Sequence, residues 1–582
     1  MSVNRPQIHG RSIVLGSEKL HVRGATYGTF RPTDGWLLPP PDQVNADFEA
    51  MAAVGINSLR TYESPPSWLL DTAQAHGLKV MVGLAWEQHI AFLDEPGRAK
   101  AITAKVVEQV RSCAAHPAIL AYALGNEIPA PIVRWHGKRP VEDFLERLYW
   151  EAKAADPEGL FAYINYPSTE YLELPFLDLA AFNVFLEDER TFESYLARLQ
   201  NLAGDRPLLI AEVGIDSRRN GEEVQARTLE WQVRHAFGTG AAGVFVFSWT
   251  DEWHRGGHEV TDWDFGLVDR ERQPKQALAA ARGAFGAIPF SPADCWPRVS
   301  VVVCTHNGER TLGQCLERAN ELAYPDFELI VVDDGSTDGS ADIALARGAT
   351  LVQTEHRGLS FARNAGVAKA TGEIVAFLDD DAYPDSDWLR YVAASLGPNA
   401  HAGTGGPNIP PDDDGWIAEC VAAAPGGPIH VLISDREAEH VPGCNMAFRN
   451  RRWRRSVAST SASASPATTS TSAGACRNRG ARSASAPAPW SCTAVATRSG
   501  ATSSSSTATA RPRRCWSASG QAATTAPAPR IGRARSTTLC PRSPGGTEWS
   551  ATGPGAAASS SRSTSRRRAP SPASWPRRSF SS

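Results

Sequence analysis

The stretch "INSLRTYESPPSWLLDTAQAHGLKVMVGLAW", residues 56–86, decides how the first half of this chain folds. Its two ends, "INSLRTY" and "KVMVGLAW", are short apolar runs typical of buried strands. Between them, "PPSWLLDTAQAHG" has apolar residues at helical spacing and a glycine where a helix would end. Two strands joined by a helix run parallel, because the helix returns the chain to the edge where the first strand began. The stretch therefore predicts one strand-helix-strand unit of a parallel sheet.

The same unit recurs through the first 290 residues. Short apolar runs alternate with helical patterns over about 250 residues. Both the alternation of strands and helices and this length are typical of a (β/α)8 barrel. We therefore predict that residues 1–290 form a TIM barrel of the α/β class. The apolar runs are residues 20–30, 56–62, 79–86, 119–127, 160–167, 179–185, 207–214 and 243–249.

Polar residues end three of the predicted strands. Asn126 and Glu127 end the fourth, Glu212 ends the seventh and Arg60 ends the second. The carboxyl ends of barrel strands meet at one face, where the chemistry of such barrels takes place. Two carboxyl groups facing each other there can hydrolyse a glycosidic bond, because one protonates the leaving oxygen and the other attacks the sugar carbon. A neighbouring arginine and asparagine can separate the two pKa values. Three further acids near strand ends, for which we expect ordinary ion pairs or helix caps, are Glu63, Glu87 and Asp251.

The strands that carry these carboxyl groups resemble a known enzyme family. "HPAILAYALGNEI" and "RPLLIAEVG" are similar to the acid/base and nucleophile strands of clan A glycoside hydrolases, in particular the family 2 barrel. The similarity extends over residues 15–287. It implies that Glu127 is the general acid/base, that Glu212 is the nucleophile and that the reaction retains the anomeric configuration.

The same resemblance implies substrate-binding roles for four residues. Asn126 would bind the sugar 2-hydroxyl, Arg60 would order the nucleophile, and Trp249 in "FSWTDEW" would offer a flat apolar face to the sugar. Asn183, in the sixth strand "FNVF", is the fourth expected substrate-binding residue. That strand departs from the family at Phe185, where these barrels often have a tyrosine. The departure leaves open an alternative, namely a barrel that binds glycans without hydrolysing them.

A second α/β domain follows a linker at residues 291–297. "RVSVVVCTHNGE" and "FELIVVDDGS" predict two buried parallel strands, the second ending at Asp333 and Asp334. "EIVAFLDDDAYPD" predicts a third strand that ends at Asp379, Asp380 and Asp381. Ligands of open α/β sheets bind beyond such strand ends. Three adjacent acids repel one another unless a cation compensates, and carboxylates completed by substrate phosphates are a typical Mg²⁺ or Mn²⁺ site.

Residues 298–450 resemble inverting glycosyltransferases of family 2, which have the GT-A fold. The resemblance implies a nucleotide-sugar donor and a glycan acceptor as partners, with a divalent metal as cofactor for this domain and none for the barrel. Asp334 would contact the nucleobase with support from Asp333, and Asp379 and Asp381 would hold the metal. The residues expected to border the donor are Asp380 and, in "SFARNAG", Arg363 and Asn364.

Residues 451–582 differ in composition from the rest of the chain. They contain 21 of the 59 basic residues, all arginine, and one of the 63 acidic residues, Glu548. The segment therefore has a formal charge of +20, whereas residues 1–450 carry −24. Rich in Ser, Ala, Thr and Pro, it lacks the apolar surface that would offset the entropy of ordering. We therefore predict a disordered tail. Nucleic-acid binding through its arginines is one alternative function, although no regular arginine repeat supports it.

A slip of the reading frame near codon 450 is our hypothesis for this change in composition. In a shifted frame, the codons of Ser, Thr and Ala encode an ordinary alternation of apolar and polar residues. Permitted codons then include a Gly-Asp-Asp segment whose two acids fall on the codons of Thr468 and Thr469. Family 2 transferases have there the base that deprotonates the acceptor. As written, no Asp follows residue 450, so we predict an impaired transferase. Nucleotide sequencing of the locus tests the hypothesis, and an unaltered frame contradicts it.

Targeting signals are absent from this sequence. The first 24 residues show no signal-peptide pattern, and no apolar run approaches the roughly 20 residues of a membrane span. We therefore expect a cytoplasmic protein, and no feature supports contact with a membrane surface. The sequence predicts a bifunctional carbohydrate-active chain, in which a glycosyltransferase is fused to a retaining glycoside hydrolase-like barrel.

Overall fold

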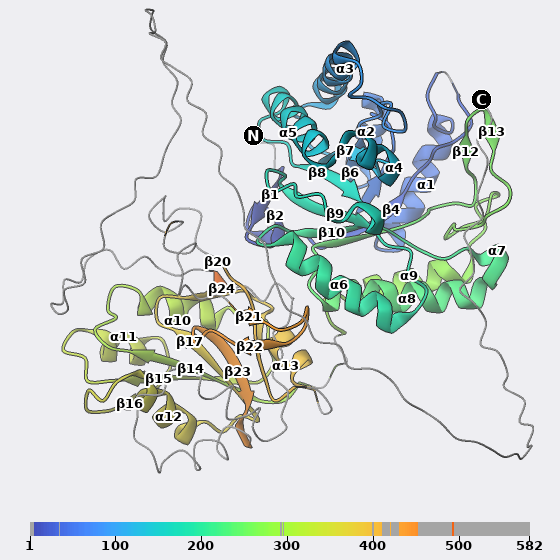
Figure 1. Cartoon of the computed structure of the whole chain (residues 1–582). Helices are drawn as coiled ribbons and strands as arrows, with labels where there is room; N and C mark the ends of the chain where they lie inside the picture. The colour runs from blue at the N-terminus through green and yellow to red at the C-terminus, as the bar shows by residue number, and fades with distance from the viewer. Residues whose placement is uncertain are drawn as a thin grey trace, which may run out of the picture. The chain divides into compact units, whose positions relative to one another are not determined.

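The structure is a computed structural model (Figure 1). It describes residues 5–33, 35–291, 294, 296–397, 401–409, 420, 430–451 and 492–493. The chain divides into two units, residues 1–501 and 502–582, and the second lies wholly outside the described residues. The predictions of a disordered tail and of a frame slip concern residues that, apart from 451 and 492–493, also lie outside the described part.

Eight parallel strands close into a barrel, as the sequence predicted. Around the barrel the order is β10, β11, β4, β5, β6, β7, β8 and β9. Most residues of these strands are buried, because helices cover the outside and side chains fill the inside. The strands are β4 (Val22–Thr26), β5 (Ser58–Arg60), β6 (Lys79–Gly83), β7 (Ile119–Asn126), β8 (Phe161–Asn165), β9 (Leu179–Asn183), β10 (Leu208–Val213) and β11 (Gly243–Val246).

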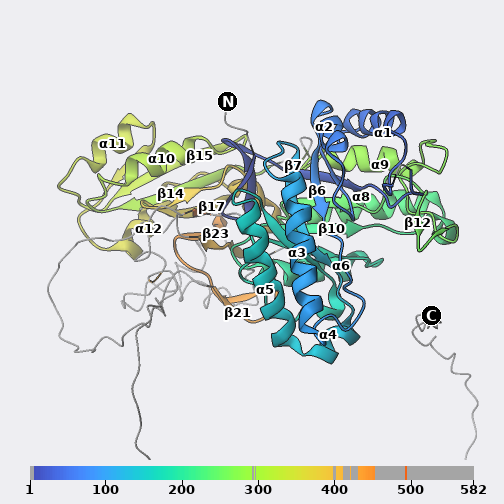
Figure 2. The same ribbon diagram turned by 90° about the horizontal axis from the view of Figure 1, so that it is seen from above.

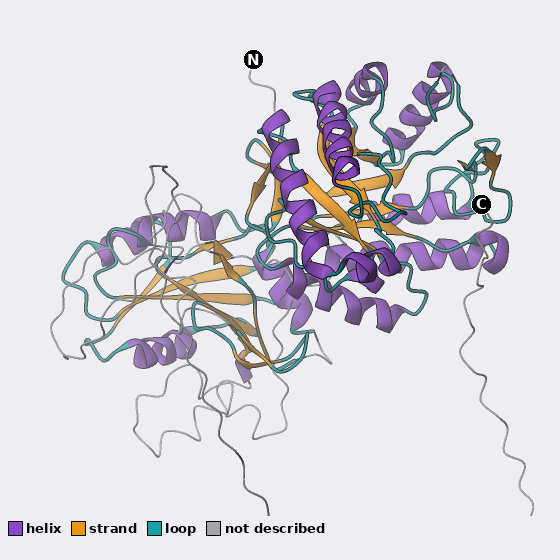
Figure 3. Cartoon of the chain, turned by 45° about the horizontal axis from the view of Figure 1, so that its top comes forward, coloured by secondary structure: helices purple, strands orange, loops and turns teal. Residues whose placement is uncertain are grey.

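Helices surround the strands (Figures 2 and 3). The longer helices bury an apolar face; in α5, for example, Val141, Phe144, Leu145 and Leu148 recur at helical intervals and are buried. The helices are α1 (Pro41–Ala53), α2 (Ser67–Ala75), α3 (Pro96–Cys113), α4 (Ala130–His136), α5 (Lys138–Ala155), η1 (Pro167–Thr169), α6 (Glu189–Ala203), α7 (Ser217–Asn220), α8 (Glu222–Gly238) and α9 (Gln276–Phe285).

Short antiparallel strands lie at both ends of the barrel. At the amino-terminal end, β1 (Pro6–His9), β2 (Ser12–Leu15) and β3 (Glu18–Lys19) form a small sheet, and Ile13 packs into the core inside the barrel with Val22. At the opposite end, the hairpin of β12 (His254–Arg255) and β13 (His258–Glu259) follows β11 (Figure 1). The predicted catalytic residues lie at this carboxyl end.

The second domain is a six-stranded sheet in the order β16, β15, β14, β17, β23, β19. The chain passes from β14 outward to β15 and β16 and then returns to the other side of β14 as β17, so the strand order reverses between β14 and β17. Strands β14 to β17 are parallel, and β23 is antiparallel to β17 and β19. The strands are β14 (Val299–Thr305), β15 (Phe327–Asp333), β16 (Thr350–Gln353), β17 (Ile374–Asp379), β19 (Gly403–Gly405) and β23 (Asn445–Arg449).

The remaining elements of this domain flank the sheet. Among them, β18, β20 and β24 form a three-stranded sheet, and β21 pairs with β22. They are α10 (Leu312–Asn320), α11 (Ser340–Ala346), α12 (Leu359–Lys369), β18 (Tyr383–Pro384), α13 (Trp388–Ser395), β20 (Asn408–Ile409), β21 (Val431–Leu432), β22 (Ala438–His440) and β24 (Cys492–Thr493). Within the described part of the chain, no helix combines the length and hydropathy that a membrane crossing requires.

Candidate active sites

Two carboxyl groups, one buried and one partly buried, lie at the mouth of the barrel. Glu212 lies within β10 and is buried. Glu127 directly follows β7, and its backbone has a φ of 53°, in the left-handed region that residues other than glycine seldom occupy. Its N–H donates to the carbonyl of Ile164 over 2.9 Å, which holds this conformation. Backbone strain of this kind is concentrated at functional sites.

Side chains from three strands connect the two carboxyl groups. Asn183, at the end of β9, donates Nδ2 to Glu127 Oε1 over 2.8 Å and to Asn126 Oδ1 over 3.2 Å. Arg60, at the end of β5, donates Nη1 to Glu212 Oε1 over 2.7 Å and to Asn183 Oδ1 over 3.2 Å. Its Nη2 donates to Asn126 Oδ1 over 2.7 Å. The barrel thus brings five of the six predicted residues into one hydrogen-bonded network.

Tyr62 belongs to this network, although the sequence analysis missed it. Its hydroxyl donates to Glu212 Oε1 over 2.7 Å, and the guanidinium of Arg60 lies 4.8 Å from its ring centroid. Burial, with the charge of Glu212, raises the pKa of Tyr62 well above its ordinary value, so the phenol remains a donor. The loop after β5 therefore supplies a tyrosine hydroxyl to Glu212, although Phe185 has none. Only its place two residues after Arg60, at a strand end, could have indicated Tyr62.

The two carboxyl groups have different electrostatic environments. Burial, and then the negative charge of Glu212, raise the pKa of Glu127 to about 7. The hydrogen bond from Asn183 and the charges of Arg60 and Arg255 act in the opposite direction. Glu212, by contrast, accepts a hydrogen bond from the guanidinium of Arg60 and another from the phenol of Tyr62. The two carboxyl groups therefore have different hydrogen-bond partners, and the pKa of Glu127 is raised.

Aromatic rings form one wall of the barrel mouth. Trp253 lies 5.6 Å from Tyr62, 5.0 Å from Phe247 and 6.0 Å from Trp263, measured between ring centroids. Trp249, which we expected to offer a ring face to a sugar, is 1% exposed and packs in the core around the strands. It therefore presents no open face, because the surrounding side chains cover both sides of the ring. Phe185, 41% exposed, has the accessible ring.

In the second domain, Asp334 is held in a cradle of donors just beyond β15. Its carboxylate accepts hydrogen bonds from the N–H of Gly358 over 2.7 Å, the hydroxyl of Thr354 over 2.8 Å and the N–H of Arg357 over 3.0 Å. Partial burial opposes ionisation, but these donors prevail and lower the pKa of Asp334. Asp333, at the end of β15, accepts from the N–H of Ser336 over 2.9 Å. The carboxylate of Asp334 is therefore fixed in place.

The acids that end β17 lie at the same edge of the sheet as Asp334, because β15 and β17 are parallel and have a single strand, β14, between them. Arg363 on α12 is buried, and its Nη2 lies 3.2 Å from Asp379 Oδ1. Asp380 Oδ2 accepts from the hydroxyl of Thr305, at the end of β14, over 2.5 Å. Asp381 follows directly, and Asn364 lies exposed on α12.

Two histidines beside Asp334 were not anticipated. The rings of His306 and His356 stack with centroids 4.0 Å apart and an interplanar angle of 29°. Each places Nδ1 at the carbonyl oxygen of Asp334, at 3.0 and 3.1 Å. They come from the loops after β14 and β16, and only the polar run "THNGE" at a strand end could have indicated the first of them.

Comparison with known families agrees with both geometries. Residues 7–290 match "Glycosyl hydrolases family 2, TIM barrel domain", and residues 300–449 match "Glycosyl transferase family 2". The chain joins a family 2 hydrolase barrel to a family 2 transferase domain.

Individual relatives match parts of the chain. The transferase domain is similar to glycosyltransferase AglE of Haloferax volcanii, 34% identical over 108 residues, or 17% of this chain and 36% of that protein. It is also similar to the putative glycosyltransferase EpsH of Bacillus subtilis, 33% identical over 106 residues, or 17% of this chain and 31% of that protein. The chain thus spans about a third of the length of these curated relatives.

Two solved structures match about half of this chain. A GH2 beta-galacturonidase from Eisenbergiella tayi, bound to galacturonate, has 18% identity and a TM-score of 0.42, covering 49% of this chain and 54% of that one. A b-glucuronidase from Ruminococcus gnavus in complex with uronic deoxynojirimycin has 17% identity and a TM-score of 0.41, covering 48% of this chain and 52% of that one. This chain therefore spans about half the length of these structures.

The transferase domain has carboxylates that fit a divalent cation. The side chain of Asp379 is 38% exposed although it ends a buried strand, so its oxygens are accessible. Arg363 already compensates part of the negative charge of the three acids. Within the described part of the chain, no cluster of three or more His, Cys, Asp or Glu could enclose a metal. Two carboxylates fit a Mg²⁺ or Mn²⁺ ion whose remaining ligands come from water and a substrate diphosphate.

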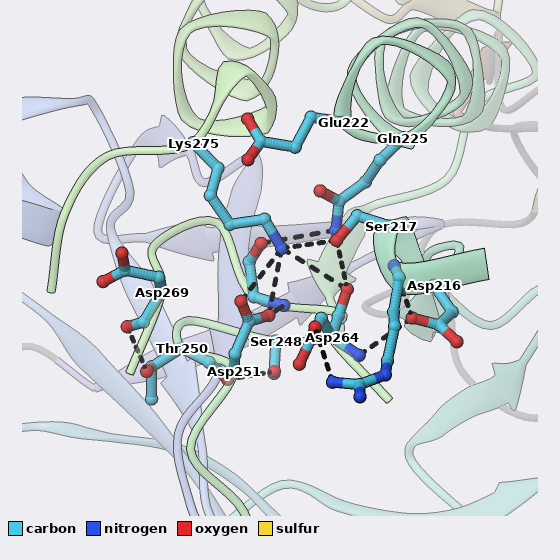
Figure 4. Close-up of polar contacts among 12 residues, drawn as sticks. Asp216, Ser217, Glu222, Gln225, Ser248, Thr250, Asp251, Asp264, Asp269 and Lys275 are labelled. Atoms are coloured by element: carbon cyan, nitrogen blue, oxygen red, sulfur yellow. Dashed lines mark hydrogen bonds and ion pairs between the residues drawn. The ribbon is translucent and has the colours of Figure 1, made fainter. Parts of the chain in front are cut away.

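A buried ion pair supports the wall of the hydrolase barrel (Figure 4). Lys275 Nζ lies 3.0 Å from Asp251 Oδ1, with both side chains almost completely buried, and donates to the hydroxyl of Ser217 over 2.8 Å. Asp251 Oδ1 also accepts from the N–H of Gly266 over 2.6 Å. Through the N–H of Gly266, the network fixes the segment that carries Trp263 and Phe265 to Asp251. The pairing of Asp251 agrees with the expectation of an ordinary ion pair.

Replacement of Lys275 by methionine should destabilise the barrel. Removal of one partner from a buried pair leaves an uncompensated charge, which costs about 3–5 kcal/mol. We expect a loss of that size in the free energy of unfolding, measured with urea and monitored by tryptophan fluorescence. Arg234→Met is the matched control, because Arg234 forms an exposed pair with Glu230 and its loss should cost less than about 1 kcal/mol. Equal effects of the two substitutions would contradict the prediction.

Proposed function

We propose that the barrel hydrolyses glycosidic bonds with retention of configuration. The observation that supports this best is the network in which Arg60 and Asn183 join Glu127, whose pKa is raised, to Glu212. Glu212 attacks the anomeric carbon while Glu127 gives its proton to the departing oxygen. A covalent glycosyl-enzyme forms and the aglycone leaves. Glu127, now ionised, takes a proton from water, which attacks the same carbon and releases Glu212.

The neighbouring side chains have supporting roles in this proposal. Arg60 and Tyr62 would orient Glu212 for its attack through their hydrogen bonds to Oε1. Asn126 is placed to bind the sugar 2-hydroxyl, and Asn183 orients Glu127. A panel of 4-nitrophenyl glycosides tests the activity, and proton NMR of the first product tests retention. Binding of glycans without turnover of any glycoside would instead favour a barrel that only recognises them.

We propose that the second domain transfers a sugar from a nucleotide-sugar donor to a glycan acceptor. Asp334, with Asp333 behind it, would bind the nucleobase end of the donor. Asp379 and Asp381 would hold a divalent cation, which when bound neutralises charge on the donor diphosphate. Asp380 and Arg363 would border the donor. Asn364, exposed on α12, would contact it only from the edge.

The base that activates the acceptor is expected in the segment after residue 450. That segment lies outside the described residues apart from 451 and 492–493. In the sequence as written it has no aspartate. We therefore propose that this chain binds a donor but transfers sugar poorly. A protein with the frame restored, supplied with Mn²⁺ and a panel of nucleotide sugars, tests this proposal, and equal transfer by both proteins would contradict it.

Binding of a nucleoside diphosphate should depend on Asp379 and on a metal. We expect calorimetric titration with UDP, GDP, CDP and dTDP in the presence of Mn²⁺ to identify one that binds. EDTA should abolish that binding, and Asp379→Asn should weaken it by about tenfold or more, or about 1.4 kcal/mol. Asp326→Asn is the matched control, because Asp326 precedes β15 at the opposite edge of the sheet. Metal-independent binding would contradict the metal assignment.

A further inference from the structure

A pocket at the carboxyl end of the barrel adjoins the catalytic network. The loop after β4 contributes Tyr27 and residues 36–38 to its lining, and the loop after β5 contributes residues 61–65. Tyr62 is one of these residues, and its hydroxyl donates to Glu212 Oε1 over 2.7 Å. Loops that follow barrel strands lie at the face where substrates bind. A ligand in this pocket would therefore lie next to the residues that we propose for catalysis.

Trp36 combines a fixed backbone with an accessible ring. Its N–H donates to the carbonyl of Thr33 over 3.0 Å, and the N–H of Thr33 donates to the carbonyl of Trp36 over 2.9 Å. The N–H of Phe30 donates to the carbonyl of Leu37 over 3.1 Å, which fixes the next residue of the same loop. The ring of Trp36 is 40% exposed. A single exposed tryptophan is ordinary on a protein surface, so the argument depends on its lining the same pocket as Tyr62.

Glu63 lines the same pocket, and its carboxylate has no partner there. From the sequence we expected an ion pair or a helix cap for Glu63, Glu87 and Asp251. Glu87 pairs with Lys105 at 3.1 Å, and Asp251 has the buried pair described above. Among the described residues, none forms an ion pair or a hydrogen bond with the Glu63 carboxylate, and α2, which follows it, has no side-chain cap. The expectation is therefore wrong for Glu63, although its backbone is fixed by a hydrogen bond of 2.8 Å from the hydroxyl of Thr61 to its carbonyl.

We propose that this pocket is a second sugar subsite, in which Trp36 and Glu63 bind a further neutral sugar of the glycan that the barrel cleaves. The inference rests on the hydrolase function proposed above and names its substrate class, an oligosaccharide of neutral sugars. A sugar ring has an apolar face of C–H groups that can pack on an indole, and its hydroxyl groups can donate to a carboxylate. An acidic sugar would place a second negative charge near Glu63, and residues 1–450 already carry a formal charge of −24. A neutral sugar therefore fits the pocket better.

Substrates that differ by one neutral sugar test this proposal in the full chain. For a sugar before the cleaved bond, release of nitrophenol is compared between the 4-nitrophenyl monosaccharide that is cleaved fastest and the corresponding disaccharide. For a sugar after that bond, the methyl glycoside is compared with the disaccharide. We expect Trp36→Ala to lower the ratio of kcat/KM for the longer to the shorter substrate about five- to tenfold in one of these comparisons. Glu63→Gln should lower the same ratio, and Trp36→Phe should restore part of it.

Two exposed residues of α5 supply the matched controls. Trp150→Ala and Glu151→Gln should leave both ratios unchanged, because neither residue lines the pocket. Thermal unfolding of each variant checks that the fold is intact. Ratios that Trp36→Ala leaves unchanged in both comparisons would overturn the proposal.

Direct binding separates this proposal from the hydrolase proposal. If wild-type protein cleaves no glycoside, the hydrolase proposal fails, and calorimetric titration still tests the pocket by itself. The titrants are glucose and galactose, their disaccharides, and the same disaccharides with one sugar oxidised to a uronic acid. Tighter binding of a neutral disaccharide than of its monosaccharide, lost in Trp36→Ala, would support the subsite. Equal binding of the two, or no binding of either, would overturn it, and a uronic-acid disaccharide that binds as tightly as the neutral one would overturn the choice of a neutral sugar.

Discussion

Glu212→Gln should abolish glycoside hydrolysis. The variant keeps the size of the side chain and an oxygen that can accept from Arg60 and Tyr62, but an amide cannot form the covalent glycosyl-enzyme. We expect kcat to fall by about 10⁴-fold or more, because the catalytic residues act together and loss of the nucleophile removes most of their joint effect. Initial rates on the best 4-nitrophenyl glycoside, together with trapping of the intermediate by a slow fluoro-sugar and mass spectrometry, measure the effect.

Glu230→Gln is the matched control for this substitution. Glu230 lies on α8 in an exposed ion pair with Arg234, so its loss should leave kcat within about twofold of the wild-type value. Thermal unfolding of all three proteins separates loss of chemistry from loss of fold. If Glu212→Gln folds normally and retains the wild-type rate, Glu212 is not the nucleophile. The network around Arg60 would then be structural.

Glu127→Gln should have an effect that depends on the leaving group and on pH. Because burial and Glu212 raise the pKa of Glu127 to about 7, the proton that it gives to the leaving oxygen is present below pH 7 and is lost as the pH rises through 7. Wild-type kcat/KM should therefore fall on the alkaline side with an apparent pKa of about 7. Glu127→Gln should lose this limb.

The choice of substrate makes this second prediction specific. We expect kcat/KM of Glu127→Gln to fall by about 10²–10⁴-fold for a leaving group that needs protonation, and far less for 2,4-dinitrophenol, which needs none. Added azide should restore turnover of the activated substrate, because a small anion can attack the glycosyl-enzyme without a general base. Equal losses on both substrates would contradict the assigned role.

Both predictions depend on Arg60 and Asn183, which separate the environments of the two carboxyl groups. Two like charges in one buried site disfavour ionisation of both groups. Arg60 contacts Glu212 directly, whereas its hydrogen-bonded path to Glu127 passes through Asn183 or Asn126. The two carboxyl groups differ in their hydrogen-bond partners because of the positions of the strands. Strands β5 and β9 place Arg60 and Asn183 between Glu127, which follows β7, and Glu212 in β10.

Much of the barrel could be predicted from the sequence. The alternation of apolar runs and helical patterns is a property of neighbouring residues, so it indicated the eight strands. The strand ends at which Glu127 and Glu212 lie followed from this local spacing, as did those of Asp333, Asp334 and the acids that end β17, because parallel strands end at one edge. Spacing alone did not separate Glu127 and Glu212 from other acids near strand ends, such as Glu87. The resemblance of their two strands to those of clan A glycoside hydrolases did.

The sequence by itself therefore determined the two folds, their order along the chain and the strand ends where acids gather. Only the tertiary structure decided the partners of these acids. Tyr62 contacts Glu212 because closure of the barrel joins segments 150 positions apart, and no local pattern encodes that contact. Packing around the strands likewise buries Trp249, and β14 brings Thr305 to Asp380. Secondary structure follows from short-range periodicity, whereas the pKa and the accessibility of a side chain depend on distant segments that only folding brings together.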